Sequence, residues 1–194
     1  MKPLDWLAAV VLFIQLPIPL FWLIVHPLVG FWRRHVRAAY LVAGLSSWGA
    51  VGAFLYRYRE RLFRSEQAAP WAVAAGLALL AAEGYLLYRV ERELGASRLV
   101  GKAELSGGGE LATQGIYARV RHPRYTGMMA AVAGACLLAS SRLMWMLAAA
   151  WWLLALFATR VEEHELRTRF GAAYVEYSKR VPRFLPFRFR SRHG

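Results

Sequence analysis

The sequence contains a single cysteine and few acidic residues, with 12 Asp and Glu against 25 Lys and Arg in 194 residues. One cysteine excludes an internal disulfide, and Cys136 lies in an apolar run, where we expect a small buried side chain rather than a nucleophile. The five histidines lack the spacing of metal ligands, so no metal site is expected. No internal repeat is present.

Charged residues are also scarce, at 19% of the chain against 58% hydrophobic residues, and the mean hydropathy is +0.31. Several apolar stretches approach the roughly 20 residues that cross a bilayer core of about 30 Å. These features indicate an integral membrane protein. The net charge of +13 does not indicate a nucleic-acid partner, because the basic residues cluster between the apolar stretches and in the tail.

The apolar pattern predicts an all-α, polytopic membrane bundle of about five transmembrane helices with a cytoplasmic C-terminal helix. Pro17 and Pro19 should kink the first span, which we interpret as retained rather than as a cleaved signal peptide. We divide the chain into N-terminal spans 1–3, residues 1–92, and a catalytic region, residues 93–194. The five expected spans are Leu4–Val25, Ala38–Leu55, Ala68–Tyr88, Pro123–Ala139 and Leu143–Thr159.

The last two spans are joined by only three residues, 140–142, which predicts a tight helical hairpin. Each has 17 residues, or about 25 Å of helix, slightly less than the bilayer core. Whether this hairpin fully crosses the bilayer is left open. Small residues on its first arm, such as Gly134, permit close helix contact.

The basic residues are distributed unequally between the two sides of the membrane. Of the 25 Lys and Arg, 19 fall in residues 33–37, 89–124 and the C-terminal part from residue 160. The positive-inside rule therefore places these segments in the cytoplasm and the N-terminus outside. We expect the membrane to be the inner membrane of a bacterium or an archaeon.

The segment 115–127, GIYARVRHPRYTG, should lie at the membrane surface, with Pro123 as the first residue of a helix. The start of that helix, with Arg121 and His122 beside it, favours a carboxylate or a phosphate. Gly127 leaves one turn bare, so that a ligand could approach the backbone. The alternative is a basic turn that only anchors the next helix.

Two further features have open interpretations. Glu83 falls within the third span, where a carboxylate is costly and is a functional candidate, although it could also pair with a neighbouring span. Residues 106–109, SGGG, form either a lid or a plain linker.

Acidic residues follow the last span. Glu163 and Glu165 each have an arginine four residues later, which predicts ordinary surface pairs. Glu162 has no such partner, so it is our first choice for a ligand contact. Because the hairpin brings Arg121 and His122 close to Glu162, the site should fit a zwitterion with a cationic centre, such as S-adenosylmethionine.

At these residues the chain resembles the superfamily of isoprenylcysteine carboxyl methyltransferases and phospholipid methyltransferases, which are integral membrane enzymes. The resemblance covers residues 93–186, but Arg98 stands where the family often has tryptophan, so the prenylcysteine acceptor stays open. The shared motifs are Gly115-Ile116-Tyr117, Arg121-His122-Pro123-Arg124-Tyr125 with Gly127, Glu162-Glu163 with Leu166, Phe170-Gly171, Tyr174, Tyr177 and Val181-Pro182-Arg183-Phe184-Leu185-Pro186.

The resemblance implies transfer of a methyl group from S-adenosylmethionine to a carboxylate or amine of a membrane lipid, a lipidated molecule or a small amphiphile at the cytoplasmic face. It implies catalytic roles for Arg121, Glu162 and Arg183. The implied cofactor-binding residues are Gly115, Tyr117, His122, Tyr125, Gly127, Glu162 and Glu163. The alternatives are a nicotinamide-dependent reductase of the same superfamily and a non-enzymatic membrane scaffold or transporter.

Overall fold

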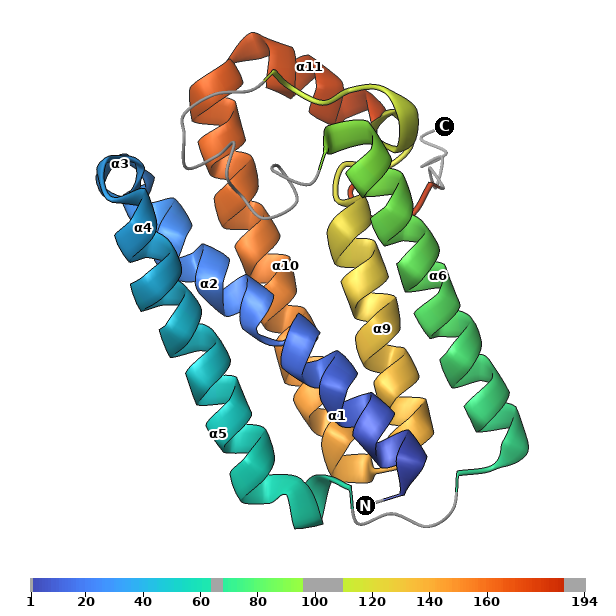
Figure 1. Ribbon diagram of the computed structural model, residues 1–194. Coiled ribbons are helices and arrows are strands. Elements are labelled where there is room, and N and C mark those ends of the chain that lie inside the picture. The colour runs from blue at the N-terminus through green and yellow to red at the C-terminus, as the bar shows by residue number, and fades with distance from the viewer. Residues whose placement is uncertain (1, 64–67, 96–109, 187–194) are drawn as a thin grey trace.

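The computed structural model describes residues 2–63, 68–95 and 110–186, and within these ranges the chain is helical without strands (Figure 1). Four helical segments are long and apolar enough to cross a membrane. This confirms an all-helical bundle with membrane-spanning helices. The four segments are Pro3–Arg34, Val36–Leu62, Pro70–Leu94 and Arg142–Phe170.

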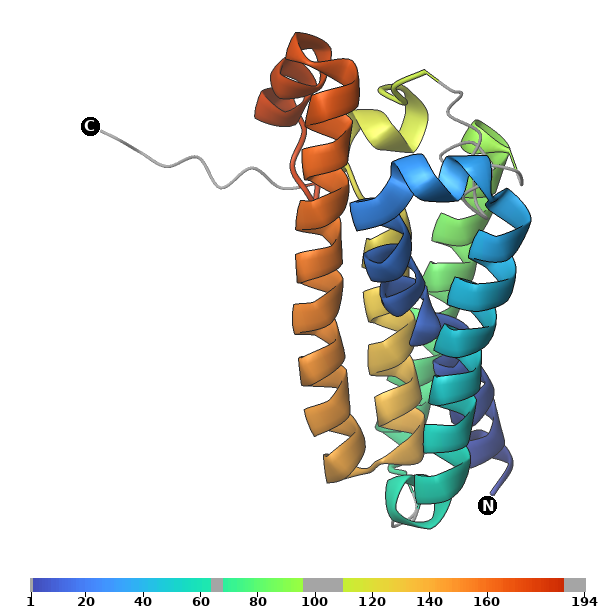
Figure 2. The same cartoon turned by 90° about the vertical axis from the view of Figure 1, so that its left-hand side faces the viewer.

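The first segment breaks where its prolines predict. α1 (Pro3–Gln15) ends just before Leu16, and α2 (Pro17–Val25) begins with a proline, which lacks the N–H that would continue the hydrogen-bond pattern. The short helices η1 (His26–Leu28) and α3 (Val29–Arg34) follow. They run across the end of the bundle rather than along it (Figure 2).

The chain then returns along the bundle. α4 (Val36–Ala38) leads into η2 (Ala39–Gly44), a π-helical turn, and into α5 (Leu45–Leu62). After residues 64–67, which lie outside the described ranges, α6 (Pro70–Leu94) begins with a proline at its first position, where no intrahelical N–H is required.

The helix α9 (Pro123–Ala139) lies in the centre of the bundle, between α6 and α10 in Figure 1. Eleven of its 17 residues are buried, and it packs most extensively against α6, then against α1 and α10. Neighbouring helices therefore cover it on several sides. A short helix of small residues suits this central position better than a position that faces lipid.

The small residues of α9 allow a close contact with α6. A Cβ atom on Gly134 would lie 2.8 Å from the carbonyl oxygen of Gly76 in α6. A Cβ on Gly76 would lie 3.0 Å from the carbonyl oxygen of Gly134. The closest backbone approach at Gly134 is thus between α9 and α6, which confirms the close helix contact expected at this residue and identifies α6 as the partner.

The hairpin itself connects α9 to α10 (Arg142–Phe170) through Ser140, which has φ 49°, and Ser141. α10 does not end at Thr159 as expected, but continues for 29 residues through the charged segment. It ends at Gly171, whose φ of 54° suits a glycine, and α11 (Ala172–Arg180) then folds over the end of the bundle (Figure 1).

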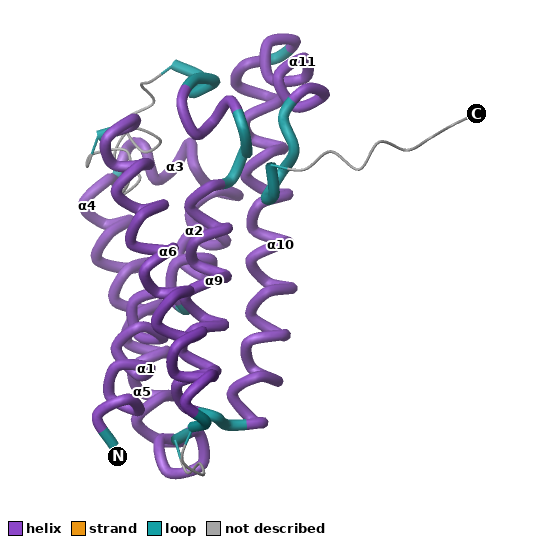
Figure 3. The backbone as a smooth tube through the Cα atoms, turned by 90° about the vertical axis from the view of Figure 1, so that its right-hand side faces the viewer, coloured by secondary structure: helices purple, strands orange, loops and turns teal. Residues whose placement is uncertain are grey.

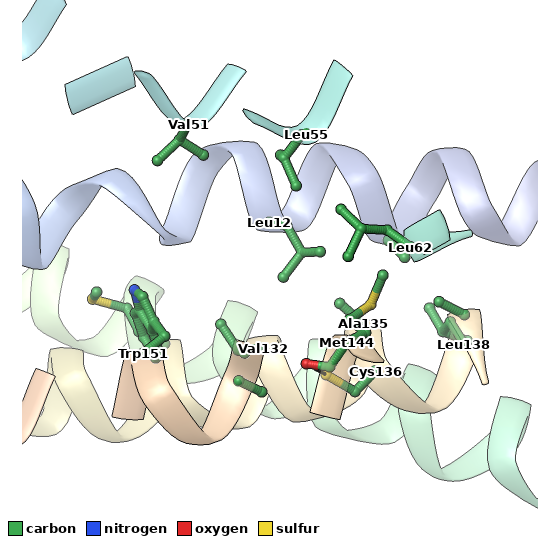
Figure 4. Close-up of a cluster of buried hydrophobic side chains, with 14 of the residues drawn as sticks. Leu12, Val51, Leu55, Leu62, Val132, Ala135, Cys136, Leu138, Met144 and Trp151 are labelled. Atoms are coloured by element: carbon green, nitrogen blue, oxygen red, sulfur yellow. Dashed lines mark hydrogen bonds between the residues drawn. The ribbon is translucent and has the colours of Figure 1, made fainter. Parts of the chain in front are cut away.

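Apolar side chains from α1, α5, α9 and α10 form the main core (Figure 4). Trp151 from α10 packs in this core, and its indole N–H donates to the carbonyl of Leu16 at 3.1 Å, next to the break in the first span. Cys136 is fully buried in the same core, where its thiol donates to the carbonyl of Met144 at 3.6 Å. It packs there as the small buried side chain that the sequence predicts.

The elements gather at two opposite ends of the bundle. α3, the C-terminal end of α6, η3 (Gly115–Ala118) and α11 lie at one end, whereas the N-terminus, the end of α5 and the start of α6 lie at the other (Figures 1 and 3). The first end carries the segments that the positive-inside rule placed in the cytoplasm. Residues 106–109, the predicted lid or linker, lie outside the described residues.

Candidate active site

The carboxylate of Glu163 lies at the centre of a buried charge cluster, with 1% of its side chain exposed. Arg183 binds it through two nitrogens, at 2.9 Å to Oε1 and 2.6 Å to Oε2. His122 Nε2 lies 3.1 Å from Oε1 and Arg121 Nη2 lies 3.2 Å from it, while Arg167 contacts Oε2 at 3.5 Å. Burial of this carboxylate is tolerated because several cationic or hydrogen-bonding groups surround it.

The backbone brings these groups together from distant parts of the chain. The N–H groups of Arg121 and His122 donate to the carbonyls of Pro182 and Arg183, each at 2.9 Å. One turn into α9, the hydroxyl of Thr126 donates to the carbonyl of Phe184 at 2.9 Å. The start of α9 is thereby fastened to the segment after α11, so both arginines face Glu163.

The neighbouring Glu162 has a different environment. Its side chain is 29% exposed, and its Oε2 lies 3.8 Å from His122 Nδ1. It lines a cavity, whereas Glu163 lies behind the cavity wall. The interpretation of Glu163 as half of an ordinary surface pair was therefore wrong. Arg167 does lie at the expected i+4 distance, but the carboxylate is buried and shared with groups far away in the sequence.

The cavity opens at the end of the bundle that carries α3, η3 and α11. Tyr117, Arg121, His122 and Tyr125 line it from η3 and the start of α9, and Glu162 lines it from α10. Other lining residues come from the first span, the ends of α6 and α10, and α11: Trp22, His26, Val90, Leu94, Glu165, Leu166, Arg169, Phe170, Tyr174 and Tyr177.

This cavity concentrates the polar atoms that lack a partner. Among the described residues, eight buried side-chain nitrogen or oxygen atoms have no hydrogen-bond partner, and five of these belong to residues lining the cavity. Because leaving such a group unsatisfied costs about 1–3 kcal/mol, their clustering marks a place where a polar ligand would complete the structure. The five atoms are His26 Nδ1, Arg121 Nε, Tyr125 Oη, Glu165 Oε2 and Tyr174 Oη.

Two tyrosines of α11 are held in their neutral form. Burial raises the pKa of Tyr177 to about 12, and its hydroxyl donates to the carbonyl of Tyr117 at 2.7 Å. Burial, together with the nearby charge of Glu163, raises the pKa of Tyr174 well above its ordinary value. The Tyr174 hydroxyl is therefore a neutral donor at physiological pH. Hydrogen bonds to Glu163 raise the pKa of Arg183, which keeps this arginine cationic.

Two expected ligand-binding glycines do not lie at the cavity. A Cβ on Gly127 would overlap the carboxylate of Glu83, so the bare turn accommodates α6 rather than a ligand. Gly115, with φ 58°, faces the side chain of Glu93, whose Oε2 accepts the N–H of Ile116 at 2.6 Å. The structure therefore gives both glycines a structural explanation.

Glu83 is buried in α6 and binds two side chains from other helices. It forms an ion pair with Arg124 of α9 and accepts a hydrogen bond from Gln15 of α1 at 3.1 Å. Arg124 also donates to Gln15 at 3.2 Å. Of the two interpretations of Glu83 that the sequence left open, this network matches the one in which the carboxylate pairs with a neighbouring span. Arg124 lines the cavity as well, so the network fixes one of its walls.

Several lining residues were not predicted. Glu165 has a partner far away in the sequence, because its Oε1 pairs with Arg33 of α3 at 3.1 Å. Trp22 and His26 come from the first span, which we had not connected with the site. The available signal was a histidine at the end of an apolar span, since intramembrane titratable side chains are by default functional candidates.

Comparisons with known proteins identify the family of this chain. The family model for phospholipid methyltransferases matches residues 71–173. The chain is 34% identical over 155 residues to the protein-S-isoprenylcysteine O-methyltransferase of Rattus norvegicus, covering 76% of this chain and 51% of that protein. It is 38% identical over 80 residues to protein-S-isoprenylcysteine O-methyltransferase B of Arabidopsis thaliana, covering 40% of each.

The chain thus spans about half the length, or less, of these curated relatives. No solved structure gives a significant match. The family model covers more than half of the chain and includes α6, α9 and α10 with both glutamates of the site. On this evidence, the chain belongs to the phospholipid methyltransferase family of membrane proteins.

Proposed function

We propose that the protein is a membrane methyltransferase that binds S-adenosylmethionine in this cavity and methylates an amphiphilic acceptor at the cytoplasmic face. The observation that carries the proposal is the set of buried, unpartnered polar atoms around the cavity, next to the cluster at Glu163. The superfamily resemblance and the relatives named as methyltransferases support the same chemistry.

The residues present fit a zwitterionic cofactor. Tyr125 and Tyr174 each offer a buried hydroxyl, and Arg121 offers Nε, as donors to a carboxylate or to hydroxyl groups. Glu162 offers the acidic group that a cationic centre requires. Glu163 does not compete for that centre, because Arg121, Arg183 and His122 already neutralise it.

S-adenosylmethionine would supply an activated methyl group for displacement at carbon. The protein's contribution is to hold donor and acceptor in line, and orientation alone can lower such a barrier by about 7–11 kcal/mol. Aromatic and apolar residues of the cavity, among them Leu166 and Phe170, exclude water and so strengthen each charge contact. Arg121 and Glu162 would touch the bound molecules.

Arg183 takes a different role in this proposal. It does not line the cavity, and both of its contacts to the site go to Glu163. We therefore assign it as a positioning residue that fixes Glu163, and through it His122 and Arg121.

The proposed arrangement in the membrane has five spans: the four long helical segments and, between the third and the fourth of them, α9. The catalytic end and the C-terminus face the cytoplasm, and the N-terminus lies outside. The lipid tail of the acceptor would enter between spans, while its head group reaches the cavity. The relatives' names point to a carboxylate of isoprenylcysteine and the family name to a phospholipid, so carboxylate and amine acceptors are both retained.

Calorimetry in detergent with S-adenosylhomocysteine tests the site. We expect Glu162→Gln and His122→Ala to lose measurable binding while both variants stay folded. The matched control is Glu176→Gln, whose carboxylate pairs with Lys179 on the surface of α11 and which should bind as the wild type does.

Wild-type affinity in both site variants would refute the assignment of the pocket. A rise in melting temperature with NADPH, and none with S-adenosylhomocysteine, would instead support a reductase. Binding of neither molecule would favour a scaffold or transporter.

A further inference from the structure

The cavity has a second wall that the family model does not cover. This wall comes from α2 and η1, and it includes Trp22 and His26. Both precede residue 71, where the match to the family model begins. The cofactor groups proposed above all lie in a different part of the chain, residues 121–174. The two walls therefore come from separate parts of the sequence.

His26 is the polar group of this second wall. Its residue is 7% exposed, and its Nδ1 is buried without a hydrogen-bond partner. The imidazole stacks on the indole of Trp22, with ring centroids 4.8 Å apart and an angle of 25° between the planes. Stacking restricts the rotation of the ring, so the imidazole is held in place before any ligand arrives.

Two contacts hold this wall against the rest of the site. The indole N–H of Trp32 donates to the carbonyl of Ile24 at 3.1 Å, which fastens α3 to α2. Arg33 of α3 pairs with Glu165 of α10 at 3.1 Å. Glu165 lines the cavity with its other oxygen, Oε2, which is buried and unpartnered. The second wall thus presents one unsatisfied polar group, His26 Nδ1, and α10, which is tied to α3 by the Arg33–Glu165 pair, adds another, Glu165 Oε2.

A methyltransferase must hold two molecules, and the groups assigned in residues 121–174 account for only the cofactor. We propose that the imidazole of His26 hydrogen-bonds the polar head group of the methyl acceptor, with Trp22 as the surface on which the imidazole rests. This inference rests on the proposed function and adds the acceptor side of the site. It also assigns a binding role to residues 1–92, which the sequence had suggested only as supporting spans.

Imidazole can either donate or accept a hydrogen bond, so His26 can serve a carboxylate or an amine head group. It forms no bond to the methyl group and takes no part in the displacement. Its effect should therefore appear in the affinity for the acceptor and leave the affinity for the cofactor unchanged.

The experiment compares three substitutions at this position. In His26→Asn the side-chain amide reaches about the place of Nδ1, in His26→Gln it reaches about the place of Nε2, and in His26→Leu no hydrogen bond is possible. Methyl transfer is measured in nanodiscs with two probes in separate arms, an N-acetylated S-prenylcysteine and phosphatidylethanolamine. The Kd for S-adenosylhomocysteine is measured in parallel. His35→Leu is the matched control, because His35 is exposed and its Nδ1 contacts only the nearby carbonyl of Phe31.

We expect His26→Leu to raise the acceptor KM roughly tenfold in the active arm, which corresponds to the loss of one hydrogen bond to a buried group. His26→Asn should restore most of the affinity and His26→Gln little of it. The Kd for S-adenosylhomocysteine should stay within twofold of the wild-type value in all variants, and His35→Leu should behave as the wild type.

Unchanged acceptor KM in His26→Leu, with an active wild type, would overturn this inference and leave the proposed function standing. Equal loss in His26→Leu and His26→Asn with weakened cofactor binding would show a merely structural role and would also overturn it. A wild type that neither binds S-adenosylhomocysteine nor methylates either probe would refute the proposed function, and this inference with it.

Discussion

Two adjacent glutamates on α10 illustrate how strongly position decides the role of a side chain. Glu163 is buried and held by groups from α9, α10 and the segment after α11, whereas Glu162 keeps an exposed edge towards the cavity. Consecutive side chains on an α-helix point in directions about 100° apart, so these two neighbours face different surroundings. One carboxylate therefore lies at the centre of the buried cluster, and the other lines the cavity.

The ion pair between Glu83 and Arg124 leads to a prediction about single residues. Removing one partner leaves an uncompensated charge among apolar helices, whereas removing both leaves none. We expect Glu83→Leu or Arg124→Leu alone to destabilise the protein by about 3–5 kcal/mol, and the double variant to be more stable than either single one. Denaturant or thermal unfolding in detergent measures the three values. Additive losses would show that the two residues act independently.

The sequence identified most of the groups of the site but not their arrangement. Arg121, His122, Tyr125 and Glu162 do line one cavity, which follows from the predicted hairpin between α9 and α10. Spacing along a helix could show only local partners of Glu163. Its strongest partner, Arg183, approaches through backbone hydrogen bonds between segments about 60 residues apart, and no local pattern records such a contact.

At the scale of elements, α9 is the helix on which the others pack. Its small residues allow α6 to approach closely at Gly76 and Gly134, and its first turn carries Arg124 to the network with α1 and α6. Small residues favour such approach because they let two backbones come into van der Waals contact. The site at the start of α9 thus depends on packing along its whole length.

This packing predicts that adding one methyl group has different effects at Gly134 and at Gly84. Gly134→Ala places a Cβ 2.8 Å from the backbone of α6, so the helices must move apart. Gly84→Ala, on α6 itself, meets nothing within 4 Å. We expect Gly134→Ala to lower the melting temperature by several degrees, since about 1 kcal/mol shifts the melting point of a chain this size by roughly 2–4 °C. Gly84→Ala should leave it unchanged or raise it. Equal melting temperatures for the two variants would contradict the close contact.

The existence of each long helix could be predicted from apolar runs, but the partners of α9 could not. A row of small residues such as that at Gly134 shows that some helix approaches closely without showing which one. The charged end of α10 was likewise separated from its span, because composition changes at Thr159 although the helix continues. Hydrogen bonding within a helix is indifferent to that change.

On the scale of the whole molecule, the two ends of the bundle differ. The cavity and the cluster at Glu163 are built at the end of the bundle that carries α3, η3 and α11, whereas the N-terminus lies at the opposite end (Figure 1). With 19 of 25 basic residues assigned to the first end by sequence, the positive-inside rule predicts that this end faces the cytoplasm.

Cysteine labelling tests this orientation, and the wild type is a suitable background because Cys136 is buried. The side chains of Glu176 on α11 and Glu60 near the end of α5 are 61% and 85% exposed, at opposite ends of the bundle. In sealed inside-out vesicles a membrane-impermeant maleimide should label Glu176→Cys and spare Glu60→Cys, and right-side-out vesicles should show the reverse. Labelling of Glu60→Cys in inside-out vesicles and of Glu176→Cys in right-side-out vesicles would show the opposite topology.

The division of the cavity between two separate stretches of sequence has a practical consequence. Residues proposed to contact the donor and residues proposed to contact the acceptor can change independently, so this assignment predicts that relatives with one chemistry diverge in what they modify. A small inhibitor that occupies only the donor side would act on many members of the family. A compound that reaches across to Trp22 and His26 would discriminate among them.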